Sequence, residues 1–282
     1  MADGSLTSLV VYVLDRAGAG LDEARRLLRL QVDAALHLGW EPERLVFLTD
    51  FPFAWRGVPC EVITRPERPR TARATSFYKT WCILRALDRL GPGDTLWYHD
   101  ADAYPLARFT EPPTDRAFSA CLYSTRERLL VQGGSLFLTP DSKPVFEWVW
   151  DALTRRGCRK DEFALTDAMA WPEHAGLFAP MDYSYNLGTT DFELRYQLAD
   201  PPLKVAHFHP DRPSHRRVFV EARNGLGVDP LPSWFRSLLV DHDFATPELA
   251  APGFRPTLER RRPEYVSTSG VAGWLERLTR RR

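Results

Sequence analysis

The segment Thr95–Asp102, TLWYHDAD, places two aspartates directly after an apolar run. Thr95–His99 has the length and composition of a buried strand. Alternation along an extended backbone would turn Asp100 and Asp102 to the same side. Two adjacent carboxylates repel each other unless a cation lies between them, and Mg²⁺ or Mn²⁺ prefers such oxygen ligands while keeping positions for phosphate oxygens. The segment therefore predicts a metal site at the end of a strand; an exposed acidic turn is the alternative.

The same spacing occurs in the triplet Asp241-His242-Asp243, but in a different setting. That triplet follows a stretch with helical periodicity rather than a buried strand, so we assign it no catalytic role. The position of an Asp-x-Asp triplet in the fold, and not its spacing alone, indicates a site.

Outward from this strand, apolar runs alternate with amphipathic stretches. Short apolar runs predict strands, and apolar residues at helical spacing that end at glycine predict helices. Strands are expected at 8–14, 45–49, 61–64, 95–99, 117–123, 135–139 and 203–208, and helices at 21–38, 75–90, 143–154, 161–170 and 231–241. This alternation predicts an α/β fold with a Rossmann-like, mixed and mostly parallel sheet flanked by helices.

The chain changes character after residue 244. It becomes rich in proline and arginine and loses its periodicity, apart from a short terminal helix expected over 271–280. We therefore predict one domain over 1–244 and a C-terminal appendage over 245–282.

Three aspartates follow the ends of expected strands. In open parallel sheets, ligands bind beyond the carboxyl ends of the strands. Asp15, Asp50 and Asp100 each lie just past such an end, which makes them candidates for binding a nucleotide co-substrate. The sequence contains no glycine-rich loop of the P-loop or dinucleotide-binding kind.

Basic residues precede and begin the helix expected at 75–90. Arg73, Ser76 and Lys79 lie near its start, after an arginine-rich loop over 65–73. Arginine is well suited to forked phosphate contacts, so these residues could bind a diphosphate; a solvated helix face is the alternative.

A pair of glycines precedes the strand expected at 135–139. Gly133 and Gly134 would allow the backbone to approach a ligand closely. An ordinary hairpin turn would use the same residues.

Two histidines alternate with Phe208 near the end of the strand expected at 203–208. An extended backbone would turn His207 and His209 to one side, where an imidazole could complete a metal shell begun by carboxylates. We predict both as metal ligands, with His207 preferred. A hydrogen-bonded core histidine is the alternative.

Two carboxylates begin the helix expected at 161–170. Asp161 and Glu162 would favour the positive end of the helix dipole wherever the helix lies, and either could instead act as a catalytic base or hold substrate hydroxyls. Tyr183, Tyr185 and Asn186 either line the same pocket or pack in the core.

Composition excludes several classes of protein. The 37 basic and 37 acidic residues cancel, so no global field attracts nucleic acid or an anionic membrane. No apolar run approaches the roughly 18 residues that span a bilayer, and the N-terminal segment lacks the basic region of a signal peptide. The four scattered cysteines are typical of reduced, buried residues. We expect a cytoplasmic protein.

Five segments occur in the order seen in GT-A glycosyltransferases, which the chain resembles over residues 8–243. They are LWYHDADAYPL (96–106), GGSLFLTP (133–140), DEFALTDAMA (161–170), YSYNLG (183–188) and VAHFHP (205–210). More narrowly, FLTDFPF, WYHDADA, HFHP and NGLGVDPLP are similar to segments of GT-A-like glycosyltransferases from bacteriophage and environmental bacteria.

The resemblance implies a GT-A fold, a nucleotide-sugar donor that is usually a UDP-sugar, and Mn²⁺ or Mg²⁺ as the cofactor. Asp100 and Asp102 match the family's Asp-x-Asp, and His207 matches its C-terminal metal-binding histidine. The Gly-x-x-Lys-Pro-Trp continuation of one retaining family is absent here. In an inverting reaction, a carboxylate such as Asp161 would deprotonate the acceptor hydroxyl.

Some similar phage enzymes glycosylate hydroxymethylpyrimidines, which implies hydroxymethylated DNA as an acceptor. Arginines could follow the DNA phosphates while nearby aromatic rings stack an extruded base; the candidates for stacking are Phe77, Tyr78, Trp81 and Phe219. The zero net charge counts against this acceptor. The alternatives are a glycan or small-molecule acceptor, a nucleotidyltransferase, and a DNA- or glycan-binding protein without activity. The donor sugar, the anomeric outcome and the oligomeric state stay open.

Overall fold

The computed structural model describes residues 5–14, 20–124 and 129–247. The predicted ligand Asp15 and all but the first residues of the predicted appendage, including the helix expected over 271–280, lie outside the described residues. Within the described ranges, no helix is both long enough and apolar enough to cross a membrane.

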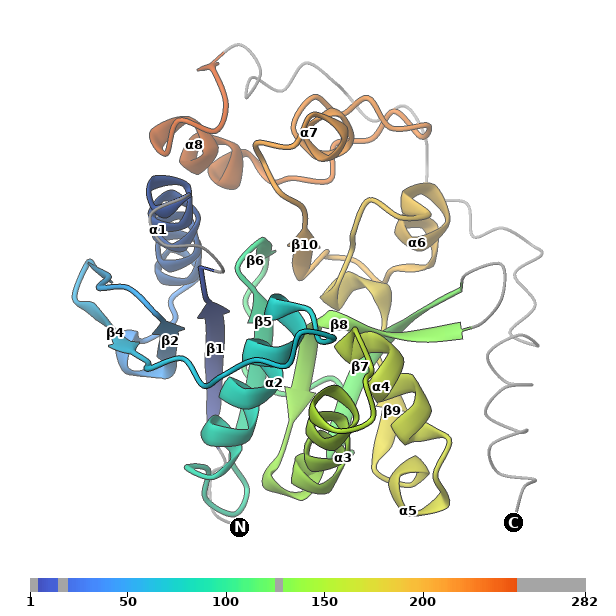
Figure 1. Ribbon diagram of the computed structural model, residues 1–282. Coiled ribbons are helices and arrows are strands. Elements are labelled where there is room, and N and C mark those ends of the chain that lie inside the picture. The colour runs from blue at the N-terminus through green and yellow to red at the C-terminus, as the bar shows by residue number, and fades with distance from the viewer. Residues whose placement is uncertain (1–4, 15–19, 125–128, 248–282) are drawn as a thin grey trace.

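A central sheet of eight strands runs through the described part of the chain (Figure 1). In spatial order the strands are β3 (Ala54–Trp55), β4 (Val58–Val62), β2 (Leu45–Thr49), β1 (Leu6–Tyr12), β5 (Thr95–Asp100), β8 (Leu129–Leu138), β7 (Phe118–Ser124) and β9 (Phe178–Pro180). The pairs β4–β2, β2–β1, β1–β5 and β7–β9 are parallel, whereas β8 runs antiparallel to both of its neighbours. The predicted mixed, mostly parallel sheet is confirmed.

Successive residues of β1 face two different helix layers. Leu9 packs with α2 (Ala74–Leu87), α3 (Lys143–Thr154) and α4 (Asp161–Met169), whereas Val10 packs with α1 (Leu21–His37). Both residues are buried, at 0% and 1% exposure, because the strand is covered on both faces. The short helix α5 (Pro172–Ala175) follows α4 on the same side of the sheet.

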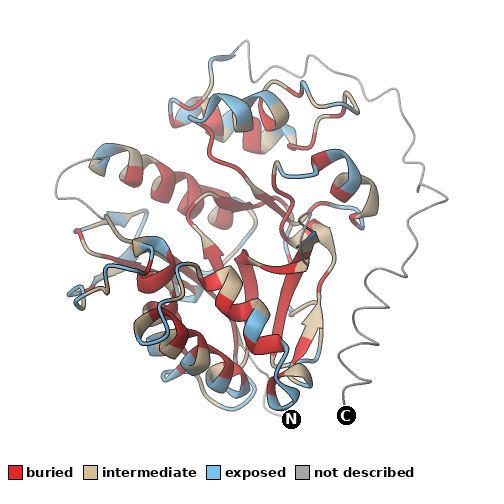
Figure 2. Cartoon of the chain, turned by 45° about the vertical axis from the view of Figure 1, so that its right-hand side comes forward, coloured by how far each residue is buried: buried red, intermediate tan, exposed pale blue. Residues whose placement is uncertain are grey.

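A smaller antiparallel sheet joins β6 (Ala103–Pro105) to β10 (Val205–His207). An aromatic core surrounds it, in which Tyr104 of β6 and Phe208 contact the helices α7 (Pro213–Phe219) and α8 (Ser233–Asp241). The helix α6 (Phe192–Leu198) packs on the same core. Figure 2 shows buried residues, in red, in these helices and in the segments that connect them. Through this core, the last third of the described chain packs against the turn after β5.

Short elements account for most of the differences from prediction. The third strand lies at 58–62 rather than 61–64, and β8 begins at Leu129 rather than at 135. The elements β3, β6, β9, α5, α6 and α7 were not predicted, nor were the single 3₁₀ turns at 42–44, 140–142 and 183–185.

Candidate active site

The two aspartates lie on the turn between β5 and β6. β5 is buried between β1 and β8 up to His99, and Asp100 is its last residue. The side chains of Asp100 and Asp102 are partly exposed, at 30% and 24%. Asp100 Oδ1 accepts a hydrogen bond from the Tyr98 hydroxyl at 2.5 Å. A buried strand thus carries two carboxylates to an open edge of the sheet.

Two buried side chains hold the backbone of this turn. Nε2 of Gln31, on α1, donates to the carbonyl oxygens of Ala101 and Ala103, each at 2.9 Å. His99 Nδ1 lies 2.8 Å from the Ala103 carbonyl oxygen and must carry the proton there, while Nε2 accepts from the Ser8 hydroxyl at 2.9 Å. Burial lowers the pKa of His99 to about 3, so the ring is neutral and this arrangement persists at physiological pH.

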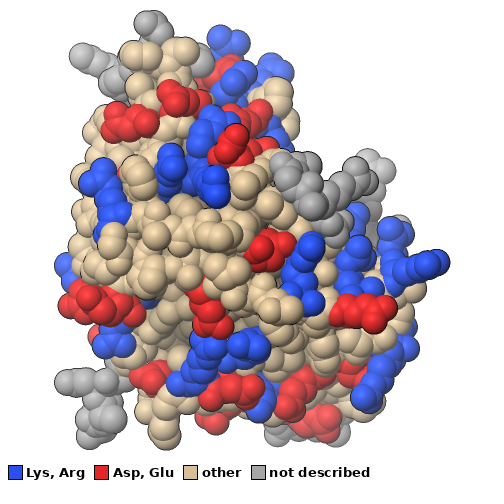
Figure 3. All heavy atoms as spheres, turned by 60° about the vertical axis from the view of Figure 1, so that its left-hand side comes forward, with Lys and Arg blue, Asp and Glu red and all other residues tan. Residues whose placement is uncertain are grey.

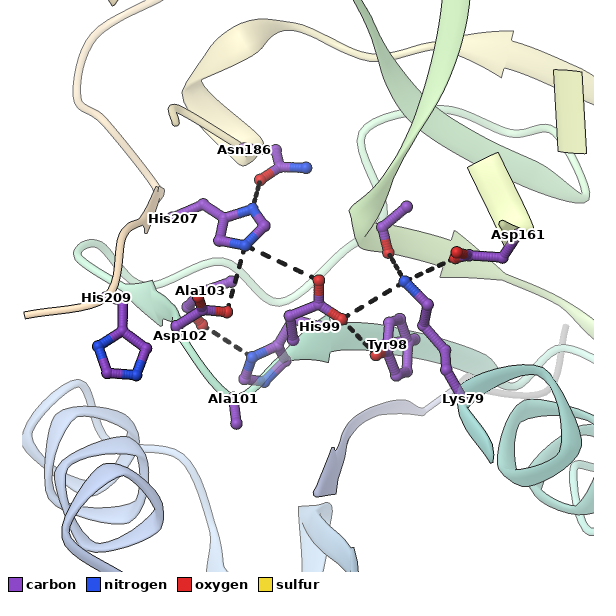
Figure 4. A network of polar contacts seen from close by, with 12 residues as sticks. Lys79, Tyr98, His99, Ala101, Asp102, Ala103, Asp161, Asn186, His207 and His209 are labelled. Carbon is purple, nitrogen blue, oxygen red and sulfur yellow. Dashed lines mark hydrogen bonds and ion pairs between the residues drawn. The ribbon is translucent and has the colours of Figure 1, made fainter. Parts of the chain in front are cut away.

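His207 reaches the aspartates from a distant part of the chain. In the β6–β10 pair it lies opposite Ala103. Its Nε2 is 3.3 Å from Asp102 Oδ1 and 3.8 Å from Asp100 Oδ2 (Figure 4). Asn186 Oδ1, 3.0 Å from His207 Nδ1, accepts the proton of that nitrogen. In the neutral ring, Nε2 therefore presents its lone pair to the carboxylates.

These three side chains form a donor set suited to a divalent cation. Among the described residues, Asp100, Asp102 and His207 are the acidic, histidine or cysteine side chains that group in this way, with one ligand atom of each within 4.8 Å of the others. Burial alone would raise the pKa of Asp102, but His207 lowers it below its ordinary value, so the carboxylate is ionised. Two carboxylates and one imidazole fit Mn²⁺ and, with more water ligands, Mg²⁺.

Lys79 connects this donor set to the start of α4. Its Nζ lies 2.6 Å from Asp161 Oδ2, 3.5 Å from Asp100 Oδ1 and 3.1 Å from the Gly133 carbonyl oxygen. Burial opposes the charge, but the two carboxylates raise the pKa of Lys79 above its ordinary value, so it remains an ammonium ion. Ser76 donates to the other oxygen of Asp161 at 2.6 Å.

The two carboxylates at the start of α4 differ in how tightly neighbouring side chains hold them. Burial would raise the pKa of Asp161, but Lys79 and Ser76 lower it below its ordinary value. A carboxylate whose pKa is lowered in this way is a poor base. Its contact with Lys79 instead positions that side chain. Glu162 accepts a hydrogen bond from the Tyr123 hydroxyl at 3.0 Å.

These groups line a cleft of about 500 Å³ at the carboxyl ends of β1 and β5. Carboxylates lie at its base, and four cationic side chains line it as well: Arg73, Lys79, Lys160 and Arg212. The amino ends of α2 and α4 also meet the cleft, and a helix amino end attracts anions. With a divalent cation in the donor set, the cleft is suited to a polyanionic ligand such as a diphosphate.

Comparison with solved structures shows which known proteins share this architecture. No protein-family model and no curated protein matches the sequence. The galactosyltransferase LgtC, solved in complex with donor and acceptor sugar analogues, matches with a TM-score of 0.51 and 11% identity over 83% of this chain and 100% of LgtC. The glycosyltransferase GlyE of Streptococcus pneumoniae TIGR4 matches with a TM-score of 0.51 and 11% identity over 91% of this chain and 66% of GlyE.

The chain has the GT-A fold. At these identities the similarity concerns the fold alone. In this GT-A fold, most of the predicted site residues line one cleft: Arg73, Ser76, Lys79, Asp100, Asp102, Asp161, Glu162, His207 and His209.

His209 lies in the cleft but outside the donor set. Its Nε2 lies 2.8 Å from Oε1 of Glu23, on α1, and its backbone N–H donates to His215 Nδ1 at 3.0 Å. The prediction that His209 binds the metal therefore gains no support from the geometry, which favours His207. An ion pair between Arg26 and Asp211, at 2.9 Å, holds the same segment to α1.

Asp50 supports the cleft without lining it. Its Oδ1 accepts from the backbone N–H of Leu14 at 2.9 Å, and its Oδ2 lies 3.3 Å from Nε of Arg65. Its predicted contact with the nucleotide stays a prediction, as does that of Asp15, which lies outside the described residues.

The prediction that Gly133 and Gly134 precede a strand is wrong, because both lie inside β8. The sequence reads as a turn there, and the register between β7 and β8 does shift across these glycines, between the pairs Ala120–Leu136 and Leu122–Val131. Tyr183 and Tyr185 pack at the edge of the core, whereas Asn186 supports His207.

Sequence reasoning missed several residues of the site. Gln31 and His99 are buried polar side chains whose partners are backbone atoms, and no pattern in the chain reveals those partners. Arg212 lines the cleft at the start of α7. Its position directly before Pro213 indicates the start of a helix, since proline favours the first turn of a helix.

Replacing Gln31 with glutamate tests the support of the turn. The change keeps the shape of the side chain but turns carboxylate oxygens toward the carbonyl oxygens of Ala101 and Ala103. We expect Mn²⁺ affinity to fall by about tenfold, since outer groups that orient ligands contribute on this scale, and stability to fall by about 2 kcal/mol. Calorimetric titration with Mn²⁺ and denaturant unfolding measure the two effects.

Gln197→Glu, the same chemical change on α6, is the matched control and is expected to alter neither quantity. Unchanged Mn²⁺ affinity in Gln31→Glu would show that the turn keeps its shape without this amide.

Proposed function

We propose that the protein is a metal-dependent glycosyltransferase that moves a sugar from a nucleotide-sugar, most simply a UDP-sugar, to an acceptor hydroxyl. The observation that carries the proposal is the meeting of Asp100, Asp102 and His207 with the Lys79 ammonium in one cleft of a GT-A fold. A fold alone does not define an activity, but this combination of charges matches a diphosphate leaving group.

Asp100, Asp102 and His207 would hold the cation. When bound, Mn²⁺ or Mg²⁺ supplies positive charge against the negative charge that develops on the departing nucleoside diphosphate. Asn186 keeps the Nε2 of His207 available, and Gln31 and His99 keep the two aspartates in place.

Cationic side chains of the cleft would bind the diphosphate. Lys79 is fixed beside Asp100 and is held as an ammonium ion, so it requires no reorganisation as charge develops. Arg73 and Arg212 line the cleft on the segments that begin α2 and α7, where a guanidinium can make forked contacts with phosphate oxygens.

Glu162 is the carboxylate that we assign to the reacting sugar or the acceptor. It lines the cleft next to Asp161, and in the described part of the chain it is Asp161, not Glu162, that forms the close ion pair with Lys79. It could accept the acceptor proton or hold a sugar hydroxyl. This assignment replaces Asp161 as the preferred base.

A donor screen tests the proposed function. The purified protein is incubated with several UDP-sugars and with UDP alone, with and without Mn²⁺, and UDP release is measured. We expect release from at least one donor, dependent on the cation. No release from any donor, together with pyrophosphate release from a nucleoside triphosphate, would favour a nucleotidyltransferase.

For the acceptor, we favour a glycan or small-molecule hydroxyl over hydroxymethylated DNA. The interpretation that Phe77 or Phe219 stacks a base is wrong, because both lie in the core at 1% and 0% exposure. On the face shown in Figure 3, acidic and basic side chains are interspersed. Labelled donor offered with hydroxymethylated DNA, unmodified DNA and free glycans separates these acceptors. Label in the modified DNA alone would restore the DNA acceptor.

Metal affinity is expected to fall as the pH falls through the pKa of His207. A proton on Nε2 removes the lone pair that would bind the cation. Although burial lowers the pKa of His207, the Asp102 carboxylate raises it above its ordinary value, so the loss begins at a higher pH than for an exposed histidine. Calorimetric titration with Mn²⁺ between about pH 8 and about pH 5.5 measures it. An affinity that is constant over this range would exclude His207 as a ligand.

A further inference from the structure

The imidazole of His207 occupies the space where a side chain at position 134 would lie. A Cβ added to Gly134 would be 2.2 Å from Cε1 and 2.4 Å from Nδ1 of His207. Such distances are far shorter than van der Waals contact, so the ring and a methyl group at this position cannot coexist.

The adjacent glycine has a different neighbour. A Cβ added to Gly133 would be 2.7 Å from Oδ2 of Asp161 and 3.0 Å from Nζ of Lys79. The two glycines of β8 therefore meet the two halves of the site separately.

Backbone conformation does not account for either glycine. Neither Gly133 nor Gly134 is among the residues with positive φ, although the register between β7 and β8 shifts across them. Where φ is not positive, alanine is ordinarily better than glycine because it restricts the unfolded chain. The contacts of the added Cβ atoms identify the space above Cα as the steric reason for glycine at these positions.

We propose that Gly133 and Gly134 are positioning residues, each of which admits one half of the site. Gly134 lets His207 reach Asp100 and Asp102, and Gly133 lets the Lys79–Asp161 pair approach β8. The inference rests on the proposed function for its effect on turnover, but the steric relation stands on the contacts alone.

A double-substitution cycle tests the relation between Gly134 and His207. Gly134→Ala alone should lower Tm by about 5 °C, because the methyl group displaces a packed ring. In the His207→Ala background the same change should leave Tm unchanged or raise it, because the ring is gone and alanine suits the strand. If Gly134→Ala lowers Tm equally in both backgrounds, the proposal is overturned.

Metal binding gives the second readout, with Mn²⁺ alone as the probe. Gly134→Ala should weaken Mn²⁺ binding by about tenfold or more, whereas Gly133→Ala should leave it within about threefold and instead lower turnover of a UDP-sugar by about tenfold. Equal loss of Mn²⁺ affinity in both variants would contradict the division of the site. A wild-type protein that binds no Mn²⁺ would refute the proposed function, and the Tm cycle would still decide the steric relation.

Discussion

Replacing Asp102 with asparagine is expected to lower kcat/KM for a UDP-sugar by about 10³-fold. Asp102 is the carboxylate closest to His207, at 3.3 Å, and it is ionised. Asparagine keeps the shape of the side chain but removes the charge that holds the cation. Steady-state UDP release and calorimetric Mn²⁺ titration measure the loss, which added Mn²⁺ should not fully restore.

Asp243→Asn is the matched control for this change. Asp243 belongs to the second Asp-x-Asp triplet, is exposed, and has a φ of 59°, which asparagine tolerates. This variant should retain wild-type turnover. Wild-type turnover in Asp102→Asn with Mn²⁺ present would end the case for a metal at this site.

Replacing Lys79 with methionine is expected to have the second largest effect, on both activity and stability. The change leaves Asp161 buried without its cation, and removing one partner of such a pair costs about 3–5 kcal/mol. It also removes the fixed ammonium ion from the proposed diphosphate site, which should lower kcat by about 10²-fold. Denaturant unfolding and UDP release measure the two losses.

A second substitution separates these two losses. In Lys79→Met/Asp161→Asn, no unpaired charge remains at this position, so most of the stability should return while kcat stays low. If kcat recovers together with stability, Lys79 supports the fold and has no part in binding the diphosphate.

Much of the sheet could be predicted because its strands carry strong local patterns. β1, β2 and β5 are apolar runs that follow turn signals, and α1 and α3 have clear helical periodicity. β6 and β10, with three residues each, are defined mainly by their pairing with one another across the chain. No local pattern predicts such a pair, because its stability comes from long-range hydrogen bonds and the aromatic core around it.

The residues of the site also fall into those that a local pattern predicts and those that depend on long-range contacts. Asp100 and Asp102 could be predicted because a buried strand delivers them, and the second triplet could be set aside because a helix precedes it. His242 in that triplet pairs with the buried Asp33 at 2.9 Å, within the fold. The supporting residue Gln31 could not be predicted, because its role depends on how α1 crosses the turn after β5.

The pairing of β6 with β10 also sets an order of events during synthesis. The nascent chain exposes Asp100 and Asp102 early, with two carboxylates and no imidazole between them. The proposed third ligand, His207, leaves the ribosome more than a hundred residues later. Under the proposed function, a translation product that ends before β10 therefore lacks one of the three proposed ligands and binds a divalent ion only weakly.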